Sequence, residues 1–281
     1  MDNILFQSRT GSVSAGQMKK SLLSIGAADC DVLYVHTGMS FGLPALKRGQ
    51  LLAELLNMLD SLGVGTLVFP TFTFSFCNGE VFSVRDSPTA MGALNEYARK
   101  TGRGRRSTDP LLSVYVIGNT LNLIENLGPY SIGTDSSYDR LHHCGKEVKF
   151  LFFGADMREC FTYTHYIEAI IGVPYRYDRE FVGTVINEGK TSPSRVWLYT
   201  CYANCRLNPR PVVYEAMQNR GLLHMEAAAG GQLCCFREQD AYVTISDLLL
   251  DNPLCLTDGN FDPSVKDTTY NPKNERILSV R

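Results

Sequence analysis

Helical and extended patterns of hydrophobic residues alternate at the start of the chain. Leucines recur at helical spacing between Gly49 and Leu62, and two short apolar runs, Val32–Val35 and Thr66–Phe69, flank this segment. A strand, a helix and a second strand in this order form a βαβ unit, whose two strands are parallel. A further helix is expected over Met18–Ile25. The opening of the chain therefore indicates an α/β fold.

The middle of the chain continues this alternation. Val148–Phe153 is an apolar run that predicts a buried strand, and Leu112–Ile117 is another candidate strand. Helices are expected over Met91–Lys100, Leu121–Leu127 and Cys160–Ile171.

The pattern changes after about Phe181. Val182–Ile186 and Ser194–Tyr199 alternate between apolar and polar residues, which is typical of half-exposed antiparallel strands. The predicted architecture is α/β, with a mainly parallel central sheet flanked by helices and an antiparallel β addition in the C-terminal third. No linker divides the chain, so residues 1–281 are expected to form one domain with two parts, 1–175 and 176–281.

Composition narrows the classes of protein. The chain has 281 residues, of which 44% are hydrophobic and 20% charged, and its net charge of −2 argues against nucleic-acid binding by bulk electrostatics. No segment approaches the roughly 18 consecutive apolar residues that a membrane span needs. Residues 1–10 lack the pattern of a secretory signal, so we expect a cytoplasmic protein without a membrane partner.

The nine cysteines predict neither disulfides nor a metal site. Their number is odd, and no pair has the C-x-x-C spacing of a zinc or redox motif. The segment His142–Cys144 contains possible ligands, but no second cluster lies at a fixed spacing from it. We expect reduced, mostly buried thiols and no bound metal.

Three polar segments follow predicted strands: His36–Gly42, Thr71–Thr73 and Gly154–Glu168. In open α/β sheets, ligands bind beyond the carboxyl ends of the strands. In the third segment, Thr162, His165 and Glu168 are spaced three residues apart, which places successive pairs near one face of a helix.

A histidine beside a carboxylate can act as a general base, because the carboxylate fixes the tautomer and stabilises the imidazolium. The same spacing also occurs in ordinary surface ion pairs. A cysteine nucleophile is a chemical rival, with Cys160 the nearest candidate to His165 in sequence. The basic run Arg103–Ser107 could hold phosphates, or could be a solvated loop.

Together these segments resemble the antibiotic N-acetyltransferase family, whose best-known members are the aminoglycoside 3-N-acetyltransferases. Five segments match the family's motifs in the same order. They are His36–Gly42 (HTGMSFG), Gly65–Thr71 (GTLVFPT), Ser87–Glu96 (SPTAMGALNE), Arg106–Ser113 (RSTDPLLS) and Phe161–Glu168 (FTYTHYIE).

The resemblance implies acyl transfer from coenzyme A to a sugar amine, with residues 1–175 binding CoA and carrying catalysis and residues 176–281 shaping the acceptor site. It implies that His165, with Glu168, is the general base, and Thr73 is a candidate donor to the oxyanion. Coenzyme A is expected to contact His36, Thr37, Ser40, Phe41 and Gly42, and also Arg106, Ser107 and Ser113. The acceptor is expected to contact Thr71, Asp109, Thr162 and Arg176.

Two positions depart from the family's motifs. Asp109 replaces a histidine before Pro110, and Phe161 replaces an asparagine before Thr162. With the small net charge, these changes favour a nucleotide-linked amino sugar of surface-polysaccharide biosynthesis as the acceptor. An aminoglycoside, as in antibiotic resistance, is the alternative, and a cysteine-dependent ping-pong acyltransferase is a further one. A homodimer would be unremarkable for such an enzyme.

Overall fold

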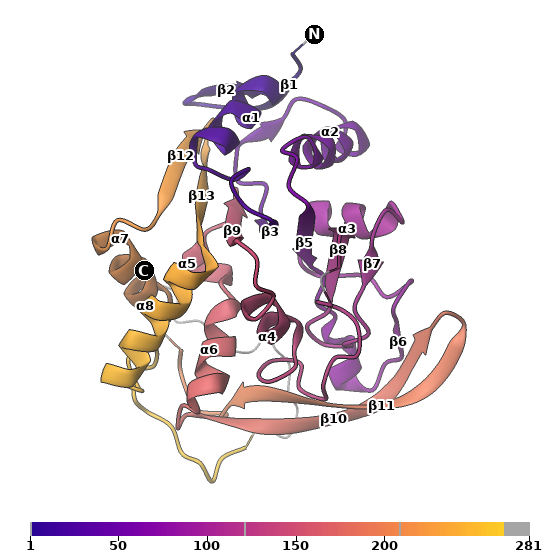
Figure 1. Ribbon diagram of the computed structural model, residues 1–281, viewed down its shortest axis with the longest axis vertical. Helices are drawn as coiled ribbons and strands as arrows, with labels where there is room; N and C mark the ends of the chain where they lie inside the picture. The colour runs from indigo at the N-terminus through magenta and orange to yellow at the C-terminus, as the bar shows by residue number, and fades with distance from the viewer. Residues whose placement is uncertain (1, 121, 208, 267–281) are drawn as a thin grey trace.

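The computed structural model describes residues 2–120, 122–207 and 209–266. A seven-stranded sheet lies at its centre, with the strand order β12-β13-β9-β3-β5-β8-β7 (Figure 1). In that order the strands span His224–Ala228, Gly231–Arg237, Val148–Phe153, Val32–Thr37, Thr66–Pro70, Val114–Gly118 and Arg105–Arg106.

Parallel pairing occurs at the centre of this sheet. β3 pairs in parallel with β5 on one side and with β9 on the other. Antiparallel pairs extend the sheet through β8 and β7 at one edge and through β13 and β12 at the other. The α/β class and the parallel centre predicted from the sequence are confirmed. Because β13 pairs with β9, segments from both sides of residue 175 share one sheet.

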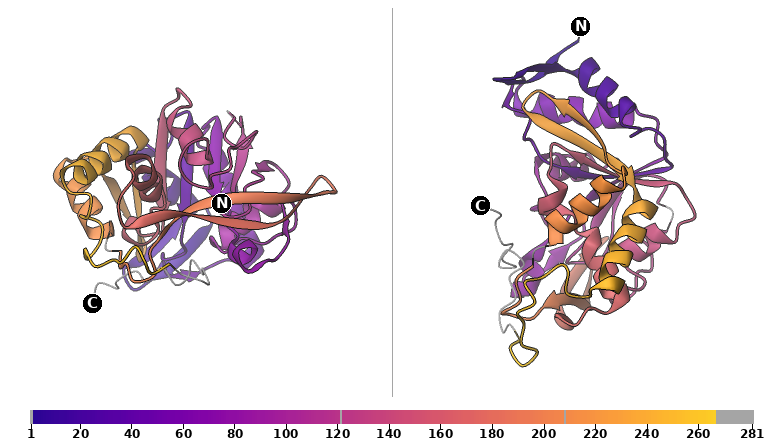
Figure 2. Two further views of the ribbon diagram at one scale, coloured as in Figure 1. Left: turned by 90° about the horizontal axis from the view of Figure 1, so that it is seen from below. Right: turned by 90° about the vertical axis from the view of Figure 1, so that its left-hand side faces the viewer.

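Helices cover both faces of the sheet (Figures 1 and 2). Side chains of β3 alternate between two hydrophobic cores: Leu33 and Val35 pack on the first face, and Val32 and Tyr34 on the second. The first face carries α1 (Ala15–Ser24), α2 (Arg48–Asp60) and α3 (Ala93–Lys100). The second carries α4 (Ser137–His142), α5 (Met157–Cys160), α6 (Tyr163–Ile171), α7 (Pro209–Asn219) and α8 (Glu238–Asp251).

A long antiparallel hairpin, β10 (Arg176–Asn187) and β11 (Lys190–Cys201), crosses the molecule on the second face (Figure 2, left). Its buried residues include Phe181 and Val196, which join the core of that face. The two predicted strands after Phe181 are therefore confirmed, and they are longer than predicted. The remaining short elements are β1 (Ile4–Ser8), β2 (Gly11–Ser14), β4 (Leu43–Pro44), β6 (Phe82–Ser83) and the 3-10 helix η1 (Phe74–Asn78).

The helix predicted over residues 121–127 is wrong for residues 122–127, which form turns; Leu121 lies outside the described residues. Asn122 and Asn126 have φ values of 63° and 52°, a left-handed conformation that a right-handed helix cannot contain. Leu123 and Ile124 are nevertheless buried, so their apolar character reflects packing of the loop.

The helix predicted over residues 160–171 is divided in the structure. α5 ends at Cys160 and α6 begins at Tyr163. Gly172, with φ of 79°, ends α6 in the left-handed conformation that favours glycine. Within the described ranges, no helix combines the length and apolar character needed to cross a membrane.

Candidate active site

The carboxyl ends of β3, β5 and β9 lie together because the three strands are parallel. The Gly38 amide donates to the Phe153 carbonyl at 2.9 Å. Thr37 Oγ1 donates to the Asn95 side chain at 2.6 Å, and Asn95 Nδ2 donates to the Pro70 carbonyl at 2.8 Å. These bonds connect the ends of the three strands at the position where α/β proteins bind ligands.

His165 lies on α6, which follows β9. Its side chain is 18% exposed, and its Nδ1 lies 2.6 Å from Glu168 Oε2. The three-residue spacing that predicted this contact places both side chains on one face of the helix.

Glu168 is fully buried and accepts several hydrogen bonds. The Tyr175 hydroxyl donates to Oε1, and Arg176 Nε lies 3.0 Å from Oε2. Burial alone would raise the pKa of Glu168, but Arg176 and His165 outweigh it and lower that pKa to about 2. Glu168 is therefore an ionised carboxylate inside the protein.

Two groups with opposite hydrogen-bonding character adjoin His165 Nδ1: Glu168 Oε2, which can only accept, and Arg176 Nη2, which can only donate. The tautomer that donates its Nδ1 hydrogen to the ionised carboxylate of Glu168 leaves the lone pair on Nε2. A neutral imidazole oriented in this way by a buried carboxylate is suited to act as a general base.

Arg176, predicted to contact the acceptor, completes this buried cluster. Its side chain is only 1% exposed, its Nη1 donates to the Tyr199 carbonyl at 2.9 Å, and its Nη2 lies 2.8 Å from His165 Nδ1. The guanidinium is thus held within the buried cluster, and the acceptor contact expected of Arg176 stays a prediction.

A second buried arginine organises the end of β5. Arg106 Nε donates to Thr71 Oγ1 at 3.2 Å and to Ser113 Oγ at 3.1 Å. Its Nη1 donates to the Ser87 carbonyl at 2.6 Å and its Nη2 to Thr73 Oγ1 at 2.7 Å. All of these acceptors are neutral oxygens.

Burial, together with repulsion from Arg99, lowers the pKa of Arg106 to about 9, which leaves the side chain charged at neutral pH. Its guanidinium donates to these protein oxygens, and Arg106 also lines the pocket described below. Arg106, Ser113 and Thr71 are thus joined in one hydrogen-bonded cluster, and the ligand contacts expected of them stay predictions.

Thr73, the predicted oxyanion donor, belongs to the same cluster. It is 5% exposed, and its hydroxyl donates to the Pro88 carbonyl at 3.1 Å while accepting from Arg106. An oxyanion contact from Thr73 would require this bond to break.

The first predicted CoA-binding segment divides between core and surface. His36 is 4% exposed, stacks on Phe152 with ring centroids 4.6 Å apart, and burial lowers its pKa to about 3. Phe41 is also buried, whereas Ser40 is exposed. His36 and Phe41 therefore act as core residues.

Gly42 serves close backbone packing. Its φ is 121°, and a Cβ there would lie 2.3 Å from the Gln7 carbonyl oxygen. Thr37, at the end of β3, is the part of this segment that lies beside α3, since its Oγ1 would lie 3.2 Å from a Cβ on Gly92.

The remaining predicted residues lie in separate surroundings. Asp109 is buried, accepts from the Ser131 hydroxyl at 2.8 Å, and has its pKa raised by that burial. Ser107 Oγ accepts from the Val114 amide at 3.1 Å. Thr162 lies one residue before α6, is half-buried and is hydrogen-bonded to Tyr138.

The structure joins two groups of the predicted site residues. One cluster contains His165, Glu168 and Arg176, and the other contains Thr71, Thr73, Arg106 and Ser113.

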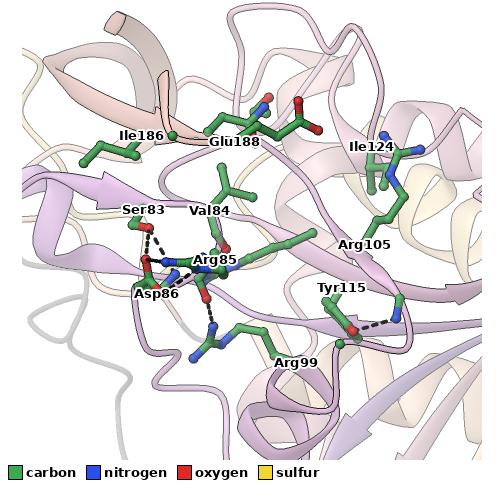
Figure 3. Close-up of a pocket in the computed structure, with 16 residues that line it drawn as sticks. Ser83, Val84, Arg85, Asp86, Arg99, Arg105, Tyr115, Ile124, Ile186 and Glu188 are labelled. Atoms are coloured by element: carbon green, nitrogen blue, oxygen red, sulfur yellow. Dashed lines mark hydrogen bonds and ion pairs between the residues drawn. The ribbon is translucent and has the colours of Figure 1, made fainter. Parts of the chain in front are cut away.

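A pocket of about 430 Å³ lies under the end of the β10–β11 hairpin (Figure 3). Ile186 and Glu188 of the hairpin line one side, and Arg99 and Arg105 contribute to the opposite side. Four arginines but only two carboxylates line this pocket, so its local charge is positive. His165 is not among the lining residues.

The further partners of Glu168 and Arg176 were not predicted from the sequence. Tyr175 and Tyr199 lie on either side of the Glu168–Arg176 pair, in the connection before β10 and on β11. The contact of His142 Nδ1 with Glu238 Oε1, 2.8 Å apart between α4 and α8, was also not predicted. In a single sequence, no spacing rule connects these positions.

All nine cysteines lie within the described residues, and none forms a disulfide. The Cys160 thiol donates to the Asp156 carbonyl at 3.2 Å, whereas the partners of His165 are Glu168 and Arg176. Across the part of the chain that the structure describes, no three His, Cys, Asp or Glu side chains are grouped as metal ligands.

The structure is that of a mixed α/β protein in which a partly buried histidine is paired with a buried carboxylate. A family model described as aminoglycoside 3-N-acetyltransferase matches residues 35–248. The chain therefore belongs to the aminoglycoside 3-N-acetyltransferase family, and the resemblance noted in the sequence is confirmed. No curated protein sequence matches the chain significantly.

Several solved structures share the fold. The YokD protein from Bacillus subtilis is 16% identical, with a TM-score of 0.68, and the match covers 86% of this chain and 94% of YokD. AAC-IIIb in its binary complex with CoASH is 14% identical, with a TM-score of 0.71 and coverage of 84% and 96%. A His-to-Ala mutant of aminoglycoside acetyltransferase AAC(3)-IVa, in complex with a gentamicin, is 19% identical, with a TM-score of 0.70 and coverage of 91% and 93%.

Proposed function

We propose that the protein is an acetyl-CoA-dependent N-acetyltransferase whose acceptor is an amine of an aminoglycoside-type amino sugar. The observation that carries this proposal is the His165–Glu168 pair, joined at 2.6 Å in a chain of this family. The solved relatives bound to CoASH and to a gentamicin support both substrates.

Direct transfer needs only one proton carrier. The amine nitrogen attacks the carbonyl carbon of the thioester while His165 Nε2 takes a proton from that nitrogen. A C–N bond forms and the C–S bond breaks, and the departing thiolate receives the proton from the imidazolium. The products are the acetamide and free coenzyme A, and no covalent intermediate on the protein is required.

The arginine-lined pocket under the hairpin fits the phosphates of coenzyme A. Arg105 lies at its edge, largely exposed and paired with Glu125, so its guanidinium can exchange that partner for a phosphate. Arg106 also lines this pocket and adds a second, buried positive charge to it. The basic run seen in the sequence would thus act partly through an exposed contact and partly through its field.

For the acceptor, the comparisons favour the aminoglycoside over the nucleotide-linked amino sugar, since nothing in them points to a nucleotide. Asp178 follows Arg176 by two residues on β10, so the two side chains leave the same face of the strand. Asp178 is exposed, and its carboxylate is suited to bind a second ammonium of a polyamine. We expect Asp178→Asn to raise KM for the aminoglycoside and to leave KM for acetyl-CoA unchanged.

Thiol release from acetyl-CoA, read with Ellman's reagent, tests the function. One acceptor panel contains aminoglycosides and the other contains nucleotide-linked amino sugars. We expect turnover with aminoglycosides, and a raised inhibitory concentration of gentamicin for a sensitive bacterium that expresses the protein.

Turnover with nucleotide-linked amino sugars alone would replace the proposed acceptor and keep the transferase. A mass increase on the intact protein incubated with acetyl-CoA alone would replace direct transfer with a ping-pong reaction. No thiol release with either panel would overturn the proposed activity.

A further inference from the structure

One buried carboxylate serves two cationic partners in this site. Glu168 Oε2 lies 2.6 Å from His165 Nδ1 and 3.0 Å from Arg176 Nε. The first partner gains and loses its charge when it accepts and releases a proton, whereas the second is always charged.

Arg176 cannot move away from this arrangement. Its Nη1 donates to the Tyr199 carbonyl at 2.9 Å, and its side chain is almost fully buried. Its Nη2 lies 2.8 Å from His165 Nδ1, the nitrogen that also lies 2.6 Å from Glu168 Oε2. The guanidinium is therefore a fixed positive charge against the imidazole ring.

The charge of the cluster changes when the base works. With neutral His165, Glu168 and Arg176 sum to zero, and after His165 takes a proton the cluster carries one net positive charge. Without Arg176, protonation of His165 would bring the net charge of the His165–Glu168 pair from −1 to zero and would leave no excess positive charge. Because charges interact strongly where water is excluded, the arginine disfavours the imidazolium.

The other groups around the cluster do not replace this effect. Tyr175 and Tyr199 adjoin Glu168 and Arg176, and burial is the main cause that raises the pKa of each tyrosine. Groups that interact at longer range with Glu168, Arg176 or their tyrosine neighbours are Asp178, Cys201, Tyr202, Cys205 and Cys255, and Asp258 interacts in turn with Cys205. Each of these is neutral or negative, so none opposes the imidazolium.

We propose that Arg176 is a positioning residue that keeps His165 in its neutral form, so that the base is ready to take the acceptor's proton at neutral pH and returns it readily to the thiolate. This inference rests on the proposed function only in calling His165 the base. The effect of Arg176 on the protonation of His165 can be measured in the absence of any reaction.

The experiment follows the imidazole signals of histidine-labelled protein by NMR from pH 5 to 9, with His165 assigned from the spectrum of His165→Gln. In Arg176→Gln, we expect the midpoint of the His165 titration to rise by about one pH unit or more. The rising limb of kcat/KM for acetyl transfer should move with it, while the high-pH plateau of kcat stays within about threefold. Arg195→Gln removes an exposed ion pair with Glu180 on the same hairpin and is the matched control.

A second variant covers the case in which Arg176→Gln, with its unpaired buried carboxylate, does not fold. Glu168→Gln with Arg176→Gln removes both charges and keeps the side-chain sizes similar. Because the two charges oppose each other in the native protein, we expect the His165 midpoint of the double variant to lie within about half a pH unit of the native one.

An unchanged midpoint in Arg176→Gln, with activity lost evenly at every pH, would mean a purely structural role and overturn the inference. A native midpoint more than about one pH unit above that of the double variant would also overturn it, because Glu168 would then act unopposed. If no acceptor is acetylated, the proposed function fails, and the NMR titration still decides the role of Arg176.

Discussion

The two buried arginines of this protein differ in what surrounds their charge. Arg176 contacts the carboxylate of Glu168 and lies 2.8 Å from His165 Nδ1. Arg106 is equally buried, but its hydrogen bonds go to neutral carbonyls and hydroxyls such as those of Ser87 and Thr73, and its guanidinium stacks over Phe82 at 4.8 Å.

Because of this difference, we expect one arginine to affect the reaction and the other to affect the stability of the fold. A buried arginine with a carboxylate beside a titratable ring influences which protonation state the ring adopts. A buried arginine with neutral acceptors joins backbone segments from different strands and leaves a positive field at the nearby pocket. Removing the first should change how the enzyme works, whereas removing the second should change whether it folds.

The largest effect is expected at the base itself. His165→Ala should lower kcat/KM for acetyl transfer by roughly 10³-fold, because the proton acceptor is lost. The Kd for coenzyme A, measured by calorimetry, should remain within about twofold. Near-native turnover in this variant would show that another group removes the proton.

Arg106→Met should destabilise the fold by about 3 kcal/mol, since several buried oxygens lose their donor. Urea unfolding measures this change, and kcat per folded molecule should stay within about threefold. The exposed neighbour Arg105 is the control, because Arg105→Gln should leave the unfolding free energy nearly unchanged. Equal losses of unfolding free energy in Arg106→Met and Arg105→Gln would show that the buried arginine stabilises the fold no more than its exposed neighbour does.

The carboxylate of Glu168 predicts a pH dependence of stability. Its pKa of about 2 lies below the ordinary value of 4.5, so its ionisation stabilises the fold above about pH 5. That contribution, on the order of 2 to 3 kcal/mol, should fade as the pH falls from 5 toward 2. The gap in unfolding free energy between the native protein and Glu168→Gln should narrow over this range, and a constant gap would contradict the ionised, buried carboxylate.

The smallest effect is expected at the rim of the pocket. Arg105→Gln should raise KM for acetyl-CoA about three- to fivefold, as expected for one exposed phosphate contact. With dephospho-CoA thioester as donor, a smaller increase would assign Arg105 to the 3′-phosphate, and an equal increase to the diphosphate. An unchanged KM for both donors would place the nucleotide elsewhere.

Local sequence patterns predict the central strands of the fold and the contact between His165 and Glu168. Val32–Val35, Thr66–Phe69 and Val148–Phe153 are almost wholly apolar because both faces of the central strands are covered, and the structure places strands at all three. Three-residue spacing on a helix predicts the contact between His165 and Glu168, which the structure shows, whereas the role of the pair as a base comes from the family resemblance and stays a prediction.

Contacts between distant or irregular segments were not predictable in this way. Arg176 reaches Glu168 through the turn after α6, and no periodicity describes such a turn. The hydrogen-bond partners of Arg106 come from three separate segments of the chain, and no local pattern indicates them. Strand direction was equally hidden: the run over residues 112–117 predicted a strand, but its antiparallel pairing with β5 depends on the path of the chain.

The turn of the β10–β11 hairpin has a consequence for how this scaffold can diversify. Glu188 and Gly189 both have positive φ, at 50° and 76°, as in the tight two-residue turns that end many hairpins. One end of the ribbon carries Arg176 in the buried cluster, and the other reaches the arginine-lined pocket. Under the proposed function, lengthening or exchanging this turn would alter the pocket and leave the His165–Glu168 pair in place, which makes the turn the natural position for a loop library in enzyme engineering.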